Sequence, residues 1–136
     1  MRIFGIGAAA AAAALAWAAP AHATGGMRCA PLRGPGPVLS LGITHGPVAQ
    51  VFAARLTDGA TEFQTGGFVG GESRRPMTVG QSWIDRQVVW IDLLDEQAQN
   101  IIGQLRARVQ PRARGFMASG TFVRNGRTWR VRCVEA

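Results

Sequence analysis

The stretch that decides the fold is FMASGTFVRNGRTWRVRC, which runs from Phe116 to Cys133. At its centre stands Asn125-Gly126, a dipeptide that strongly favours a two-residue type I′ turn between two β-strands. A hairpin centred on this turn has a fixed register. It pairs Arg124 with Arg127, Phe122 with Trp129, Gly120 with Val131, and Ala118 with Cys133.

This register sorts most apolar side chains of the hairpin onto one face. The predicted core face holds Phe116, Ala118, Gly120, Phe122, Trp129, Val131 and Cys133. The predicted outer face holds Met117, Ser119, Thr121, Val123, Thr128, Arg130, Arg132 and Val134. A slip of one residue would destroy this sorting. The arginine-rich run from Arg124 to Arg132 is therefore interpreted as part of a hairpin with a wet side.

Short apolar runs separated by turn residues continue the β pattern toward the N-terminus. We expect strands over residues 38–44, 48–56, 61–69 and 82–94, with turns at 45–47 and 58–59. Segment 72–81 contains Arg74, Arg75 and Pro76 and is predicted as an exposed loop.

Residues 95–110 fit two patterns. Apolar residues follow helical spacing, with Asp95 as a possible N-cap, and they also alternate as in a strand from Ile101 to Val109. Gly103 in mid-segment disfavours the helix by about 1 kcal/mol. We favour a turn over residues 95–100 followed by a strand, and the helix stays as the alternative.

Together these segments predict an all-β chain. Regular strand spacing with intervening turns is typical of a single small antiparallel meander barrel or sandwich, here of about seven strands.

The first 23 residues predict a cleavable signal peptide. Arg2 precedes an alanine-rich apolar stretch, and Ala21-His22-Ala23 fits the small-x-small cleavage pattern. The apolar stretch is shorter than the roughly 20 residues of a membrane-spanning helix. We therefore predict a signal at 1–23, a Gly/Pro-rich arm at 24–37 and a β domain at 38–136. The mature protein is expected to be soluble, in the periplasm or outside the cell, and not membrane-spanning.

The chain has two cysteines, Cys29 and Cys133. Export into an oxidising compartment predicts that they form a disulfide, which would staple the N-terminal arm to the last strand.

Residues for catalysis or metal binding do not assemble. His45 is the only histidine after the predicted signal, and no serine lies in a nucleophile-elbow pattern. One histidine and two paired cysteines do not supply a zinc site, and the acidic cluster Asp92, Asp95 and Glu96 lacks the spacing of an EF-hand. We expect no enzyme activity, cofactor or metal.

Arginine is the residue type with a pattern. The formal net charge is +7, and every basic residue is arginine. The candidate binding surface consists of Arg74, Arg75, Arg106, Arg108, Arg130 and Arg132. Such a surface can bind polyanions, although arginines also serve to keep the outside of a sheet wet. The predicted export excludes nucleic acid as the ordinary partner.

These observations predict an exported, non-enzymatic β domain that binds a protein or an anionic envelope component. The contact would be made by the arginine surface or by the loop over residues 66–81. One alternative is a small barrel with an apolar ligand in a pocket lined by Trp83, Trp90, Phe122 or Trp129. Another is an inhibitor of a secreted enzyme, because the chain is similar in size, compartment and disulfide to small exported bacterial β domains that include lysozyme and protease inhibitors.

Overall fold

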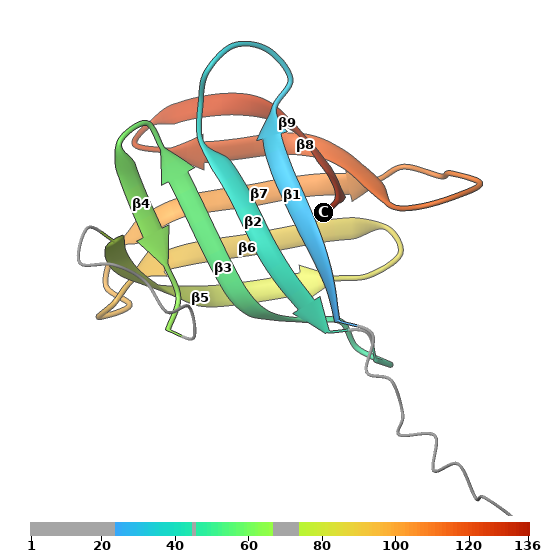
Figure 1. Ribbon diagram of the computed structural model, residues 1–136, viewed down its shortest axis with the longest axis horizontal. Helices are drawn as coiled ribbons and strands as arrows, with labels where there is room; N and C mark the ends of the chain where they lie inside the picture. Colours follow the sequence, from blue (N-terminus) through green and yellow to red (C-terminus); the bar gives the residue numbers. More distant parts are fainter. Residues whose placement is uncertain (1–23, 45, 67–73) are drawn as a thin grey trace, which may run out of the picture.

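The chain folds into a closed β-barrel whose strands follow one another in sequence order (Figure 1). The computed structural model describes residues 24–44, 46–66 and 74–136. The strands in this part of the chain are β1 (Thr24–Pro31), β2 (Val38–Thr44), β3 (Gln50–Asp58), β4 (Thr61–Gln64), β5 (Arg74–Ile84), β6 (Val88–Asp95), β7 (Ile101–Val109), β8 (Met117–Arg124) and β9 (Arg127–Glu135). The all-β prediction is confirmed, with nine strands in place of about seven.

The pairing around the barrel is mostly antiparallel. One pair departs from the predicted antiparallel meander, because β4 and β5 run parallel, with Glu62 opposite Arg74. The sequence predicted either a barrel or a sandwich. The sheet closes on itself, so the fold is a barrel.

The C-terminal hairpin has the predicted register. Phe122 lies opposite Trp129 and Ala118 opposite Cys133. Asn125 and Gly126 both have positive φ, 51° and 74°, as a type I′ turn requires. The predicted core face is confirmed by the residues that are buried on it, which are Ala118, Phe122, Val131 and Cys133.

Residues 95–109 form a turn and a strand, and the helix alternative is wrong. The carboxylate of Asp95 accepts hydrogen bonds from the backbone N–H of Gln99 and the side chain of Asn100, each at 2.8 Å. One detail of the predicted strand is corrected. A register shift between Leu93 and Leu94 turns Ile101 outward, where it is 59% exposed, and Ile102 is buried instead.

The predicted loop over residues 72–81 is wrong in its larger part, because β5 begins at Arg74. Its hydrophobic pattern is weak, since Met77 is the buried residue of the strand. Edge-type residues such as Pro76 also argued for a loop. Residues 67–73 lie outside the described part of the chain, and so does the end of the predicted strand over 61–69.

The predicted single strand over 82–94 is two strands joined by a tight turn. The carboxylate of Asp85 accepts hydrogen bonds from the backbone N–H groups of Gln87 and Val88, at 2.7 and 2.8 Å. This local side-chain to backbone bonding stabilises a turn. The turn places Trp83 on β5 directly opposite Trp90 on β6.

The predicted arm over residues 24–37 is also corrected, because it begins with a strand. β1 pairs with β2 on one side and with β9 on the other, so it closes the barrel. Cys29 lies opposite Cys133 in this seam, and the two form the predicted disulfide across 104 residues of sequence. In the chain-entropy description such a loop closure stabilises the fold by about 4–5 kcal/mol.

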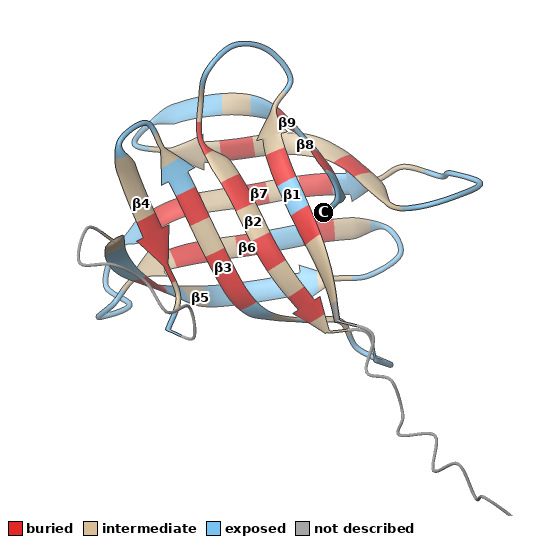
Figure 2. Ribbon diagram, viewed as in Figure 1, coloured by how far each residue is buried: buried red, intermediate tan, exposed pale blue. Residues whose placement is uncertain are grey.

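Side chains fill the interior of the barrel. Buried residues alternate with partly buried or exposed ones along strands such as β2, β6 and β9, as Figure 2 shows. Phe122 is 2% exposed, and a Cβ atom at Gly103 would collide with its ring. Glycine at this position therefore makes room for the largest core side chain.

Candidate arginine binding surface

The outer wall formed by β6 to β9 and β1 carries two rows of facing residues. The first row runs Trp90, Arg106, Thr121, Arg130 across β6 to β9. The second runs Arg108, Ser119, Arg132, Ala30 across β7 to β9 and β1. Because side chains alternate along a strand and the intervening residues are buried, these residues point to solvent.

Four exposed arginines share this wall, and we call them the arginine face: Arg28, Arg108, Arg130 and Arg132. Arg130 and Arg132 are two residues apart on β9, a rise of roughly 6.8 Å. Arg108 lies two strands from Arg132, roughly 10 Å away. Arg28 faces Val134 on β9, which makes it a diagonal neighbour of Arg132 at about 7–8 Å.

Small hydroxyl side chains separate the arginines. Ser119 and Thr121 on β8 lie between the arginines of β7 and those of β9. Their hydroxyl groups can donate and accept hydrogen bonds between these arginines. Among the residues that the structure describes, no carboxylate forms an ion pair with the arginine face.

Arg106 belongs to the predicted surface but has a different role. Its Nη2 lies 2.7 Å from Oδ1 of Asp92, and its Nη1 donates to the carbonyl of Leu105 at 2.8 Å. Its guanidinium carbon also lies 5.7 Å from the ring centroid of Trp90. Arg106 is thus held in place, and the Asp92 carboxylate offsets its charge.

Arg74 and Arg75 do not join the arginine face. They begin β5 beside β4, where Nε of Arg74 lies 3.4 Å from Oε2 of Glu62. Arg75 lies over the ring of Phe63, at 6.0 Å from its centroid. The six predicted arginines are therefore divided between two regions, and Arg108, Arg130 and Arg132 stay together.

Arg28 is the member of the arginine face that the sequence interpretation missed. Arg28 lies in the predicted arm over residues 24–37, for which the sequence predicts no strand register. The sequence signal is the order Met27-Arg28-Cys29, with a charged residue between two apolar ones, and the structure buries Met27 and Cys29 while Arg28 is exposed.

The described residues also line hollows at two places outside the arginine face. The first, of about 480 Å³, is a surface hollow beside Trp83, Trp90 and Arg106. The two indoles are 61% and 50% exposed. The predicted interior pocket lined by Trp83, Trp90, Phe122 or Trp129 does not form around these residues. Trp83 and Trp90 lie outside the barrel, Phe122 is in the packed core, and Trp129 packs against that core.

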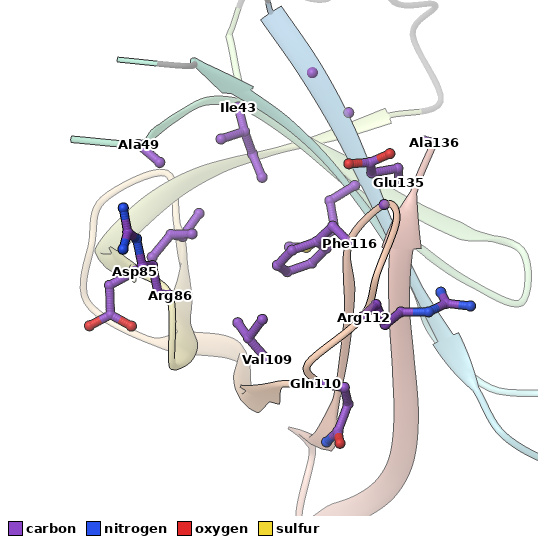
Figure 3. A pocket seen from close by; sticks show the side chains of 15 residues that line it. Ile43, Ala49, Asp85, Arg86, Val109, Gln110, Arg112, Phe116, Glu135 and Ala136 are labelled. Carbon is purple, nitrogen blue, oxygen red and sulfur yellow. The ribbon is translucent and has the colours of Figure 1, made fainter. Parts of the chain in front are cut away.

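The second hollow, of about 630 Å³, lies at one end of the barrel, and we call it the mouth pocket. Figure 3 shows Ile43, Val109 and Phe116 turned into it, while the guanidinium of Arg112 points away. The opposite end is closed by Arg124, whose Nε lies 2.8 Å from Oδ2 of Asp58 and which covers the Phe63 ring at 5.1 Å.

Two aspartates in the described residues, Asp85 and Asp95, have lowered pKa values, and both accept hydrogen bonds within turns. Hydrogen bonds, first from the backbone N–H of Gln87 and then from the Trp83 indole, hold the pKa of Asp85 below its ordinary value. The side chain of Asn100 is the main cause that lowers the pKa of Asp95. Across residues 24–44, 46–66 and 74–136 no cluster of three metal-ligating side chains occurs. His45 lies outside the described residues.

Comparison with known protein families, curated proteins and solved structures found no match for this chain. In the described part of the chain, no helix is long and apolar enough to cross a membrane.

Proposed function

We propose that the protein is an exported, non-enzymatic binding domain that holds an anionic polymer of the cell envelope along the arginine face. The observation that carries this proposal is the contrast in charge pairing on the outer wall. Arg28, Arg108, Arg130 and Arg132 are exposed and form no ion pair with any described residue, whereas Arg106 beside them is paired with Asp92. Unpaired guanidinium groups in fixed register attract polyanions.

The shape of the arginine face supports a polymer as the ligand. Its charges spread over β7, β9 and β1 on the outer wall of the barrel, and the two hollows described above are lined by other residues. A small anion would contact one or two arginines there, whereas a chain of repeated charges can contact several at once. Such binding gains from each contact and weakens as salt screens the charges.

Export is part of the same proposal. The signal pattern at residues 1–23 supports it, and so does a disulfide, which persists in oxidising compartments. N-terminal sequencing of the protein recovered from its native host is expected to begin at Thr24. Recovery of the full-length chain in the cytoplasm would contradict export.

The binding test asks whether affinity depends on where the arginines lie or only on the net charge of the protein. We expect the oxidised protein to bind dextran sulfate and not uncharged dextran. The substitutions Arg130→Gln and Arg132→Gln together should weaken this binding about tenfold, or about 1.4 kcal/mol. The matched control is Arg112→Gln with Arg114→Gln, which removes the same charge from an exposed turn outside the arginine face.

Equal losses in the two double variants would mean that net charge alone drives binding and would contradict the proposed surface. A tight complex with a secreted enzyme, together with no binding of dextran sulfate, would favour an inhibitor instead.

A second candidate function rests on the mouth pocket. β-Barrels commonly bind small ligands at their mouths, and this pocket is lined by apolar side chains such as Ile43, Val109 and Phe116. It would take an apolar ligand, at a place other than the one the sequence predicted. Fluorescence of 1-anilinonaphthalene-8-sulfonate should rise on binding and fall with Val109→Asp. No signal from the folded wild type would reject this candidate.

A further inference from the structure

The exposed tryptophan pair beside the arginine face has no role in the packing of the core. Trp83 and Trp90 lie directly opposite each other on β5 and β6, and they are 61% and 50% exposed. Large exposed apolar side chains that adjoin one another commonly mark a binding site. The neighbouring residues Gln81 and Ser82 line the same hollow and supply hydrogen-bonding groups at its edge.

Both indoles are held in place before any ligand arrives. Nε1 of Trp83 donates a hydrogen bond to Oδ2 of Asp85 at 2.9 Å. Trp90 is contacted by Arg106, which Asp92 fixes in turn. Exposed aromatic rings that are already ordered lose little conformational entropy on binding. Trp83 and Trp90 thus form an ordered, exposed aromatic surface, which we call the platform.

The tryptophan pair lies on one continuous row with Arg130 of the arginine face. Trp83, Trp90, Arg106, Thr121 and Arg130 follow one another across β5 to β9. With strands about 4.8 Å apart, the row spans roughly 19 Å along the barrel wall. A single extended ligand can therefore touch the indoles at one end and, at the other, the guanidinium of Arg130, with Arg132 two residues further along β9.

We propose that the ligand is an anionic glycan, with sugar rings stacked on Trp83 and Trp90 and acidic groups on the arginine face. This inference rests on the proposed function and names the chemical class of the polymer. The apolar C–H face of a sugar ring stacks on an indole, and the ring hydroxyls bond to amide, hydroxyl and guanidinium groups such as those of Gln81, Ser82 and Arg106. A polyanion without rings would use the arginines alone.

The test uses two anionic probes, a heparin hexasaccharide and inorganic polyphosphate, with the full oxidised domain. Trp83→Ala and Trp90→Ala should each weaken binding of the hexasaccharide about fivefold and leave binding of polyphosphate unchanged. Trp90→Phe should lose less than Trp90→Ala, since a ring remains. Intrinsic tryptophan fluorescence should shift with the hexasaccharide and not with polyphosphate.

The outcomes separate the two proposals. Equal binding of both probes by the wild type and the tryptophan variants would overturn the glycan inference and leave the arginine face intact. Loss of both probes in Trp90→Ala, with an unchanged unfolding midpoint, would also overturn it, because the indole would not distinguish sugar from phosphate. Failure of the wild type to bind either probe would reject the proposed function as well.

Discussion

Two groups of arginines on the same barrel differ in what surrounds them. Arg55, Arg74, Arg106 and Arg124 each form an ion pair with a carboxylate, and we call them the scaffold arginines. The arginine face has no such partners among the described residues. Identical side chains thus serve structure in one group and are available for a ligand in the other, and sequence composition alone does not distinguish them.

The largest expected effect on stability concerns Arg124, the most enclosed scaffold arginine, whose side chain is 11% exposed. Arg124→Met would leave Asp58 without its partner and free the carbonyl of Ile102, to which Nη1 donates at 3.2 Å. We expect a loss of about 2 kcal/mol in the free energy of unfolding, measured by urea denaturation. The same variant should bind dextran sulfate only slightly more weakly, because it loses one positive charge that lies outside the arginine face.

The double variant Arg124→Met with Asp58→Asn should recover part of the lost stability, because no carboxylate is left unpaired. A single variant as stable as the wild type would contradict the scaffold role of Arg124.

A smaller effect is expected where the two groups meet, at Arg106. Asp92→Asn would remove the carboxylate that offsets the Arg106 charge, so that Arg106 would resemble the members of the arginine face, which have no ion pair. We expect about 1 kcal/mol less stability together with tighter binding of dextran sulfate. Weaker binding at an unchanged fold would contradict the assignment of Arg106 as charge-neutralised.

The distinction between the groups could be predicted from the sequence only in part. The Asn125-Gly126 turn fixed the register of β8 and β9, and it placed Arg130 and Arg132 outward as the structure has them. The ion-pair partners of the scaffold arginines could not be predicted, because residues such as Asp58 and Arg124 are 66 positions apart in the sequence. A contact of that kind follows from closure of the barrel.

The other differences between the predicted and observed strands arise from strand pairing, a side-chain-stabilised turn and a bulge. β1 was hidden in a Gly/Pro-rich segment, since its strand character comes from pairing with β2 and β9 on both sides. The apolar run over 82–94 concealed a turn, because the hydrogen bonds of one side chain, Asp85, create it. The bulge near Leu94 moved Ile101 outward, and alternation by itself does not reveal a bulge.

The smallest expected effect is a pH dependence that separates barrel stability from the arginine face. Asp85 and Asp95 have pKa values below their ordinary value of 3.8, so the folded state favours their charged forms. Their contribution is fully present above pH 3.8 and is lost as the pH falls through the lower pKa values of the folded state. Guanidinium groups keep their charge throughout.

The effect is measured as the urea midpoint of unfolding at pH values from about 6 to about 2, a range that covers the titration of aspartate side chains. The variant Asp85→Asn with Asp95→Asn should be less stable than the wild type at pH 6, and the gap should close at low pH. A gap that stays constant with pH would contradict the role of the two carboxylates.

The central claim is that the arginine face holds an anionic polymer through several guanidinium groups at once. The direct measurement is the slope of log K against log salt concentration for dextran sulfate, in the wild type and in a variant with Arg28, Arg108, Arg130 and Arg132 all replaced by glutamine. Each ionic contact contributes roughly one unit to such a slope. We predict that the slope falls by about three to four units while the unfolding free energy stays within about 0.5 kcal/mol per substitution. An unchanged slope in a folded variant would show that the polymer binds elsewhere.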